Sequence, residues 1–367
     1  MLKISRTTIR LLGLAGCIVV STGCEVPTAL PIWNTVWQVP ADSSEVTVAS
    51  LLPASVGVVD VGAGVKAFSF SLPAASASTT LGETCYACAA ANGTRQPKPA
   101  FTLAESTTVA MPTDVITADI VGGRIDYALT SGFGFDPLNP GAGARGWVRI
   151  RISAGSTLIA RDSIDGASLT LPTGVARPRS MALLASSVAP IHLNGPVTLV
   201  ATMFSPAGDS ATMNTSEQFS VSAAANDIRV SQVSINVPTT TFAPQHGVVD
   251  LSGIDNATTG KIAGGAVILG IRNPFAVGGS LSMDFRAPDG AHVTKGFTLN
   301  VGGPGSAPST IRLGMTTAEI NSLIGQKDVA ITISGSVSAP NGNVTVTPIQ
   351  KMAITTLVEA TIVTGGK

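Results

Sequence analysis

Short apolar runs alternate with polar positions along most of the chain. Val148, Ile150 and Ile152 alternate with Arg149 and Arg151, so a strand here would bury one face and expose both arginines. Valine, isoleucine, threonine and serine dominate such runs, and 39 glycines and 23 prolines separate them. This pattern is typical of many strands joined by turns, and it predicts an all-β protein built of antiparallel β-sandwiches.

A single segment follows a helical pattern instead. Thr316 can cap a helix over residues 317–324, and Glu319 stands where a capping box needs it. Gly325 is placed to end the helix. We therefore expect one short helix among the strands.

Two parts of the chain repeat a pattern of strand, proline-containing turn and strand. The first copy covers residues 122–152, and the second covers residues 264–285. A further matching pair of strands begins at Val197 and Val329, each followed by a turn that contains proline. Because the features come in the same order, we infer a tandem duplication with its boundary near Pro238.

The repeats and the composition divide the chain into five segments. We expect residues 1–23 to be a signal peptide and residues 24–44 a proline-rich tether. Residues 45–115 should form an N-terminal β-hairpin region with a cysteine-containing loop. Residues 116–236 and 237–367 are the two sandwich repeats.

Two tryptophans stand out in the tether. Trp33 and Trp37 are spaced so that both would lie on one side of an extended segment. We expect these indoles to pack onto the first sheet, with an exposed binding platform as the alternative.

The first 24 residues combine positive charge, an apolar stretch and a cysteine. Three positive residues precede the apolar residues 11–20, and small residues then lead to Cys24. This arrangement resembles a bacterial lipoprotein signal peptide. The resemblance implies export, cleavage before Cys24 and attachment to a membrane through lipid on that cysteine. Glu25 at the next position implies the outer membrane.

Cys17 is the alternative lipidation site. Residues 14–17, Leu-Ala-Gly-Cys, match the lipobox of this family better than residues 21–24 do. Modification at Cys17 would leave only residues 11–16 as the apolar stretch, below the usual length of roughly 7 to 15 residues. Length therefore favours Cys24, and a cleaved signal without lipid stays a further alternative.

The turn in the second copy carries another resemblance. Asn273-Pro274-Phe275 joins two strand-like segments and resembles the opening of the late-embryogenesis-abundant (group 2) and related water-stress β-sandwich family. In the first copy the Asn-Pro pair is displaced to residues 139–140. The resemblance implies an immunoglobulin-like sandwich with no catalytic residues.

The charge balance limits the partners. Charged residues make up 12% of the chain and the net charge is zero. The chain therefore lacks the electrostatic footprint of a nucleic-acid binder or of a protein recruited by anionic lipid. We expect no nucleic-acid partner; the expected partners are the membrane, through the lipid anchor, and an envelope protein.

Cys85 and Cys88 are the only cysteines outside the signal region. A structural zinc site needs four ligands, and the three histidines are remote in sequence, so we expect no metal. In an oxidising compartment the pair should close as a disulfide that stiffens its loop. Free thiols and a redox pair are the alternatives, but a redox pair typically needs a following helix, and residues 89–93 provide at most one turn.

The sequence contains no nucleophile-elbow, zincin or phosphate-loop motif, so we expect neither enzymatic activity nor a cofactor. The leading hypothesis is an exported lipoprotein that acts as a structural or interaction module of the cell envelope. A carrier of a lipid or other apolar ligand is the alternative, and it would need an apolar cavity of roughly 300 Å³ or more. A thiol-disulfide oxidoreductase that uses Cys85 and Cys88 is the third hypothesis.

Overall fold

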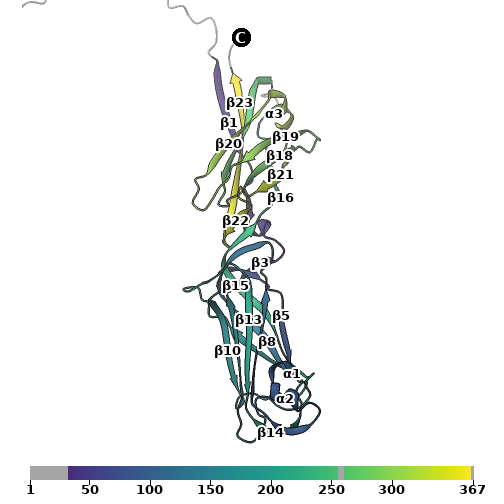
Figure 1. Cartoon of the computed structure of the whole chain (residues 1–367). Helices are drawn as coiled ribbons and strands as arrows, with labels where there is room; N and C mark the ends of the chain where they lie inside the picture. The colour runs from purple at the N-terminus through teal and green to yellow at the C-terminus, as the bar shows by residue number, and fades with distance from the viewer. Residues whose placement is uncertain (1–31, 255–259, 365–367) are drawn as a thin grey trace, which may run out of the picture.

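Two β-sandwiches lie end to end and give the molecule the shape of a rod (Figure 1). The computed structural model describes residues 32–254 and 260–364. Every pair of named strands in it is antiparallel. The expectation of an all-β protein built of antiparallel sandwiches is confirmed.

One sandwich, which we call the insert domain, covers residues 56–236. Its strands are β3 (Val56–Asp60), β4 (Lys66–Phe70), β5 (Ala75–Thr80), β6 (Arg95–Lys98), β7 (Phe101–Val109), β8 (Val115–Ser131), β9 (Trp147–Ala154), β10 (Thr157–Asp165), β11 (Arg177–Ala182), β12 (Ile191–Leu193), β13 (Val197–Ser205), β14 (Gly208–Thr212) and β15 (Gln218–Asn236). Two short helices, α1 (Leu81–Thr84) and α2 (Tyr86–Ala90), lie between β5 and β6.

The other sandwich, which we call the terminal domain, covers residues 33–51 and 240–364. Its strands are β1 (Trp33–Pro40), β2 (Ser44–Thr47), β16 (Thr240–Val249), β17 (Ile262–Arg272), β18 (Gly278–Arg286), β19 (His292–Leu299), β20 (Ser309–Met315), β21 (Val329–Ser338), β22 (Asn343–Val346) and β23 (Lys351–Thr364). It also contains a 3-10 turn, η1 (Val48–Leu51), and helix α3 (Thr317–Leu323).

Both domains have the same strand order. In the insert domain, sheet I has the order β10-β9-β13-β7, and sheet II is built on β11-β8-β15-β5. The terminal domain has β19-β18-β21-β16 as sheet I and β20-β17-β23-β1 as sheet II. Each domain has eight main strands, numbered here along the chain: β5, β7, β8, β9, β10, β11, β13 and β15 in the insert domain, and β1, β16, β17, β18, β19, β20, β21 and β23 in the terminal domain. In both domains sheet I then has the order 5-4-7-2 and sheet II the order 6-3-8-1, which is the order of a jelly roll. This order differs from the seven-stranded immunoglobulin-like sandwich that the second resemblance implies.

The insert domain interrupts the chain of the terminal domain. Strands β1 and β2 pair with β23, the chain then runs through the insert domain, and it returns to the terminal domain at β16. The segment 45–115 is therefore not a unit of its own: β2 belongs to the terminal domain, and β3 to β7 belong to the insert domain. A pattern read along the chain cannot reveal this, because strand pairing joins residues that are far apart in sequence.

Residues 33–40, expected in an irregular tether, form strand β1. Trp33 pairs with Thr364 and Pro40 pairs with Leu357, so β1 covers one edge of sheet II in the terminal domain. Pro40 is the only proline in the strand, and the residues before it keep the backbone N–H groups that a ladder needs.

The two copies recognised in the sequence fall on equivalent strands. Residues 122–152 cover parts of β8 and β9, while residues 264–285 cover parts of β17 and β18. These strands are the third and fourth main strands of their domains.

Each copy opens with two glycines, and the second glycine is tightly packed. A Cβ on Gly123 would lie 2.5 Å from the carbonyl oxygen of Asp227, and a Cβ on Gly265 would lie 2.6 Å from that of Glu359. The repeated Gly-Gly pair thus marks the place where the third strand passes close to the eighth.

The turn between the third and fourth strands also has an equivalent in both domains. In the insert domain Asp136 Oδ1 accepts a hydrogen bond from the N–H of Leu138 at 2.8 Å, and Oδ2 accepts one from the N–H of Leu171 at 3.1 Å. Asp136 thus accepts from the N–H two residues on, as Asn273 does, while Asn139 Nδ2 donates to the carbonyl oxygen of Leu169 at 3.1 Å, as Asn273 Nδ2 does to that of Asn300.

Asn273 makes the same kind of turn with an amide. Its Oδ1 accepts from the N–H of Phe275 at 3.1 Å, and its Nδ2 donates to the carbonyl oxygens of Val277 at 2.8 Å and Asn300 at 3.1 Å. Each domain thus ties this turn to the loop between the fifth and sixth strands, through Asp136 and Asn139 in the insert domain and through Asn273 in the terminal domain.

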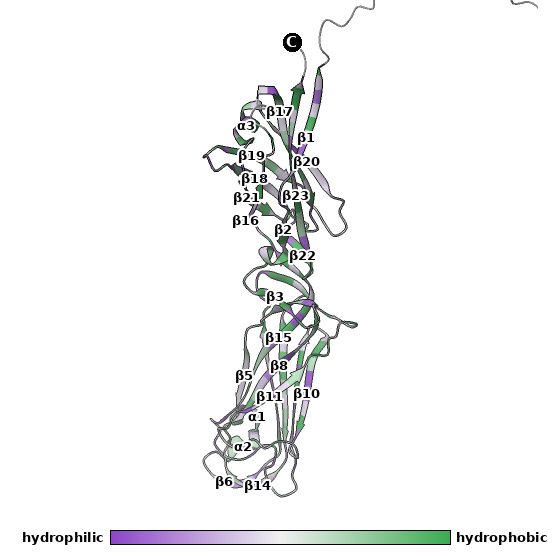
Figure 2. Ribbon diagram, turned by 180° about the vertical axis from the view of Figure 1, so that it is seen from behind, coloured by the Kyte–Doolittle hydropathy of each residue, from purple (hydrophilic) through white to green (hydrophobic). Residues whose placement is uncertain are grey.

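Strand β15 runs beyond the insert domain and joins the two sandwiches. Its last residues, Val233 to Asn236, pair with β22, so sheet II of the insert domain gains a strand from the chain of the terminal domain. The buried apolar side chains of both domains form one cluster. In Figure 2 the strands carry apolar and polar positions in alternation on both sides of this junction.

The predicted helix is confirmed as α3. Thr316 Oγ1 accepts from the N–H of Glu319 at 3.2 Å, and the Glu319 carboxylate accepts from the N–H of Thr316 at 2.8 Å. Two further helices, α1 and α2, were not expected. The same capping box, formed by Thr80 and Glu83, begins α1, so its Thr-x-x-Glu signal was present in the sequence.

Candidate functional site

The lipidation site predicted at Cys24, and its alternative Cys17, lie outside the described residues. The described chain begins at the pole of the rod where it also ends, because Trp33 pairs with Thr364 (Figure 1). Among the residues that the structure describes, no helix is long and apolar enough to cross a membrane.

The two tryptophans of β1 lie next to this pole. Both are on the same side of the strand as Val39, which packs against the core. Trp33 is nevertheless 65% exposed and Trp37 is 41% exposed. The expectation that a sheet covers both indoles is therefore wrong, because they lie in an edge strand near the end of the sandwich.

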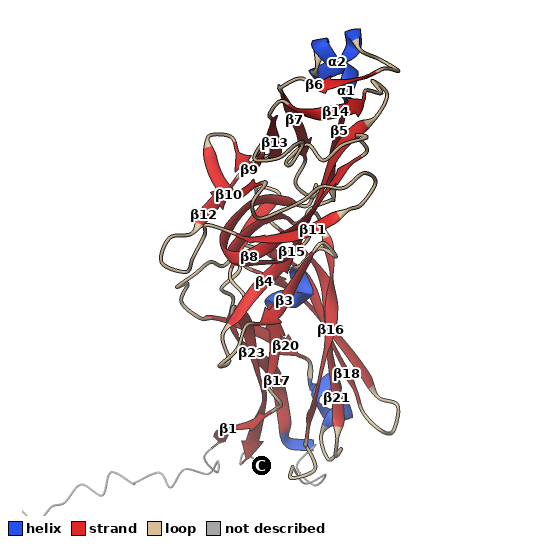
Figure 3. Ribbon diagram, turned by 90° about the horizontal axis from the view of Figure 1, so that it is seen from below, coloured by secondary structure: helices blue, strands red, loops and turns tan. Residues whose placement is uncertain are grey.

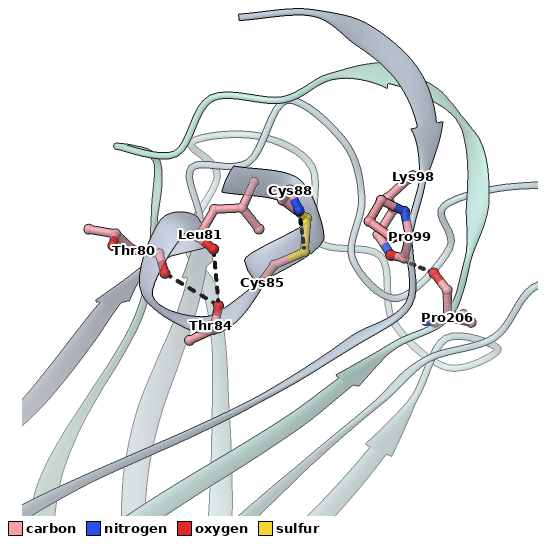
Figure 4. The surroundings of a disulfide bond; sticks show 8 residues. All are labelled: Thr80, Leu81, Thr84, Cys85, Cys88, Lys98, Pro99 and Pro206. Atoms are coloured by element: carbon pink, nitrogen blue, oxygen red, sulfur yellow. Dashed lines mark hydrogen bonds between the residues drawn. A yellow bond between two sulfur atoms is a disulfide. The ribbon is translucent and has the colours of Figure 1, made fainter. Parts of the chain in front are cut away.

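Cys85 lies between α1 and α2, and Cys88 lies within α2, at the opposite pole (Figures 3 and 4). Their sulfurs are bonded to each other, and the N–H of Cys88 lies 3.1 Å from the Cys85 sulfur. Both residues are buried in the core cluster. Thiol-disulfide exchange requires that a thiolate reach one of the sulfurs. Burial of the pair therefore favours a structural disulfide over a redox centre.

A buried lysine lies beside this tip (Figure 4). Lys98 Nζ donates to the carbonyl oxygen of Pro99 at 2.9 Å and to that of Pro206. It also lies 4.7 Å from the ring centre of Phe101 and 5.3 Å from that of Phe135. Burial lowers the pKa of Lys98 to about 8. No feature of the sequence singled out this residue.

The space between the two sheets of the insert domain bears on the carrier hypothesis. An apolar cavity there, lined by residues that include Ile125, Ile152 and Leu199, has a volume of about 30 Å³. A small-molecule site needs roughly 300 Å³ or more. This cavity is too small for a lipid chain.

The outer face of sheet I in the insert domain gathers unpaired positive charge. Arg149 and Arg151 alternate with buried residues in β9, as the sequence predicted, and Arg161 in β10 pairs directly with Arg151. All three are exposed. Within residues 32–254 and 260–364, no carboxylate lies within 4 Å of any of these guanidinium groups. We call these residues the arginine cluster.

Aromatic and hydroxyl side chains continue this face. The Arg149 guanidinium lies over the Trp147 ring at 4.3 Å, and Trp147 packs against Phe204 with ring centres 6.1 Å apart. The register of β13 and β7 places a field of hydroxyl groups next to the cluster, from Thr102, Ser106, Thr108, Thr198 and Thr202.

A hollow of about 460 Å³ adjoins the arginine cluster, with Ser163 and Asp162 also in its lining. The Asp162 carboxylate already has partners: it accepts from the Tyr127 hydroxyl, and its Oδ2 lies 3.5 Å from Arg179 Nε. Burial and this carboxylate raise the pKa of Tyr127. Asp162 therefore belongs to a partly buried polar group with Tyr127 and Arg179, and it also reaches the lining of the hollow.

A second hollow, of about 640 Å³, lies over sheet II of the insert domain. Its charged side chains are already paired. Asp126 accepts from Asn226 Nδ2 at 2.7 Å and lies 3.6 Å from Arg124, and the hydrogen bond from Asn226 lowers the pKa of its carboxyl group. Because small side chains such as Ala128 make up much of the rest of its lining, it offers little to hold a ligand.

The corresponding outer face of the terminal domain balances its charges. Asp284 pairs with Thr294 in the register and accepts from its hydroxyl at 2.8 Å. The same carboxylate contacts His292 and lies 3.6 Å from Arg286. Among the described residues, no group of three or more His, Cys, Asp or Glu side chains is arranged to hold a metal ion.

Comparison with known proteins gives no functional assignment. No family model matches the chain, and no curated protein matches it. Among solved structures, a candidate secreted protein from Parabacteroides distasonis is 11% identical over 89% of this chain and 99% of its own, with a TM-score of 0.29. Broad bean stain virus (7% identity, 80% of this chain and 90% of that one, TM-score 0.19) and infectious bursal disease virus (12%, 90% and 79%, TM-score 0.20) are also similar. The jelly-roll assignment rests on the strand order of this chain alone.

Proposed function

We propose that this chain is an exported, non-enzymatic lipoprotein that is anchored through Cys24 to the outer membrane and acts as an interaction module of the cell envelope. One observation carries the proposal. The described chain starts at one pole of the rod, while the insert domain with its arginine cluster lies toward the other (Figure 1). An anchor attached to this start holds the insert domain away from the membrane.

The distance from the anchor to the rod fits this role. Seven residues lie between Cys24 and Ile32, the first described residue, and the eight steps from one to the other span at most roughly 28 Å. The described body therefore stays close to the membrane at its terminal domain and reaches outward with its insert domain.

A non-enzymatic role is supported by the chemistry of the described residues. The two cysteines are buried and bonded to each other, and the cavity between the sheets holds only about 30 Å³. Neither observation favours the oxidoreductase or the carrier.

Metabolic labelling with a palmitate analogue in a bacterial host tests the anchor. We expect labelled protein in the membrane fraction from the natural chain and from Cys17→Ser, and none from Cys24→Ser. Label that survives in Cys24→Ser but disappears in Cys17→Ser would move the anchor to Cys17. Absence of label from all three forms would overturn the lipoprotein assignment.

A further inference from the structure

The arginine cluster brings like charges close together, and this repulsion lowers stability without any need from the fold. Arg151 and Arg161 stand directly opposite each other across two antiparallel strands, where side chains are about 5 Å apart at Cβ and like charges destabilise the pair. Arg149 lies two residues along the strand from Arg151, roughly 7 Å away. Three positive charges therefore share one short stretch of a chain whose net charge is zero.

We propose that the arginine cluster and the hydroxyl field beside it bind an acidic polysaccharide, a chain of sugars that carry carboxylate groups. The guanidinium group matches a carboxylate with two parallel hydrogen bonds. Repeated carboxylates along one polymer can engage several members of the cluster at once, which removes the repulsion between them. This proposal rests on the proposed interaction role but is independent of the anchor at Cys24.

The neighbouring side chains favour a sugar polymer over a protein partner. Thr202 pairs with Arg149, and Ser106 pairs with Val200, which itself pairs with Arg151, so hydroxyl groups flank the cluster along the face. Hydroxyl groups suit the many donors and acceptors of a sugar chain. Protein interfaces typically have an apolar core, whereas the apolar side chains of this face, Trp147, Val200 and Phe204, are only half-exposed and lie among the hydroxyl groups.

The ring of Trp147 contributes through Arg149. The guanidinium stacks on the ring, which limits its motion and fixes the direction of its N–H donors. Trp147 is thus a positioning residue for Arg149, at the edge of the face that a sugar chain would follow.

Affinity electrophoresis and calorimetry of the full chain test the proposal with three polymers. Polygalacturonate carries sugars and carboxylates, dextran carries sugars only, and poly-L-glutamate carries carboxylates only. We expect binding to polygalacturonate that weakens with added salt, no binding to dextran, and at least tenfold weaker binding to poly-L-glutamate.

Substitutions then assign the binding to the cluster. Arg151→Gln and Arg161→Gln should each weaken polygalacturonate binding about tenfold, and the triple variant with Arg149→Gln about a hundredfold. Arg286→Gln is the matched control, because it removes one positive charge from the equivalent face of the terminal domain. Thr202→Val should weaken binding to polygalacturonate and leave the residual binding to poly-L-glutamate unchanged.

The folding of the variants can be checked in the same samples. Arg161→Gln removes one member of a like-charge pair, so it should leave the melting temperature unchanged or raise it. Equal binding to poly-L-glutamate would identify an acidic protein or simple polyanion as the partner and overturn the polysaccharide. Loss of binding in Arg286→Gln, or no binding to polygalacturonate at all, would overturn the site while leaving the palmitate result untouched.

Discussion

The two jelly rolls share a strand order but differ in how the outer face of sheet I handles charge. In the insert domain Arg151 lies opposite Arg161 without a carboxylate within 4 Å in the described residues. In the terminal domain Asp284 lies opposite Thr294 and contacts His292. The terminal domain thus pairs its charges internally, while the arginines of the insert domain have no carboxylate partner among the described residues. The same scaffold supports both solutions because this face lies outside the core.

The connection between the first and second strands differs just as much. In the insert domain it carries α1, α2 and the bonded Cys85–Cys88 pair. In the terminal domain the same connection carries the whole insert domain. Elaboration of one loop therefore sets the length of the rod and places the arginine cluster away from the chain ends. Substitutions at equivalent positions test whether the two domains are structural counterparts.

The largest loss of stability is expected in the terminal domain, at the turn after the third strand, β17. This turn is hydrogen-bonded to the loop between the fifth and sixth strands, β19 and β20. Asn273→Asp would place a buried carboxylate against the carbonyl oxygens of Val277 and Asn300, which now accept from the amide. We expect the free energy of unfolding to fall by about 4 kcal/mol, as for an uncompensated buried charge. The midpoint of urea unfolding measures this loss.

The equivalent substitution in the insert domain is the control. Asp136→Asn keeps an oxygen that can accept from Leu138 but puts an NH₂ group near the N–H of Leu171. We expect a loss of about 2 kcal/mol from one hydrogen bond left unsatisfied. Equal losses in both domains would contradict the different roles assigned here to the Asp136 carboxylate and the Asn273 amide.

Local patterns predicted the strands, the capped helix at Thr316 and the outward direction of Arg149 and Arg151, because alternation and capping act between near neighbours in sequence. The position of Arg161 opposite Arg151 depends on register, which no local pattern contains. The exposure of Trp33 and the burial of Lys98 depend on how separate segments pack. For the same reason the sequence pattern predicted residues 45–115 as one region, although the fold divides them between the two domains.

The next largest loss of stability is expected in the insert domain, where the third strand, β8, passes close to the eighth, β15. Gly123 has a φ of +129°, and a Cβ there would lie 2.5 Å from the Asp227 carbonyl oxygen. Gly123→Ala should lower the free energy of unfolding by about 3 kcal/mol, from the strained φ and the steric clash together. Gly122→Ala is the matched control, since a Cβ at Gly122 meets nothing within 4 Å. A melting temperature that falls equally in both variants would contradict this account.

A smaller effect should come from the titration of Lys98 in the insert domain. Its pKa is lowered from 10.5 to about 8 by burial, so between these pH values the unfolded chain binds a proton that the folded chain does not. Stability should therefore rise as the pH rises from 8 to 10.5, by about 2 kcal/mol. Urea unfolding across this range measures the slope, and Lys98→Met should remove that contribution. An unchanged slope in the variant would place the titrating group elsewhere.

The smallest effect should come from Glu319 in the terminal domain. The hydrogen bond from Lys295 and the capping bond from the N–H of Thr316 lower the pKa of Glu319 from 4.5 to about 2. A lowered pKa contributes stability above pH 4.5 that is lost as the pH falls through 2. Glu319→Gln should therefore cost about 1 kcal/mol at neutral pH, since the pair is partly exposed. That difference should vanish near pH 2 in calorimetric unfolding; a difference that persists there would mean that Glu319 acts through packing and not through its charge.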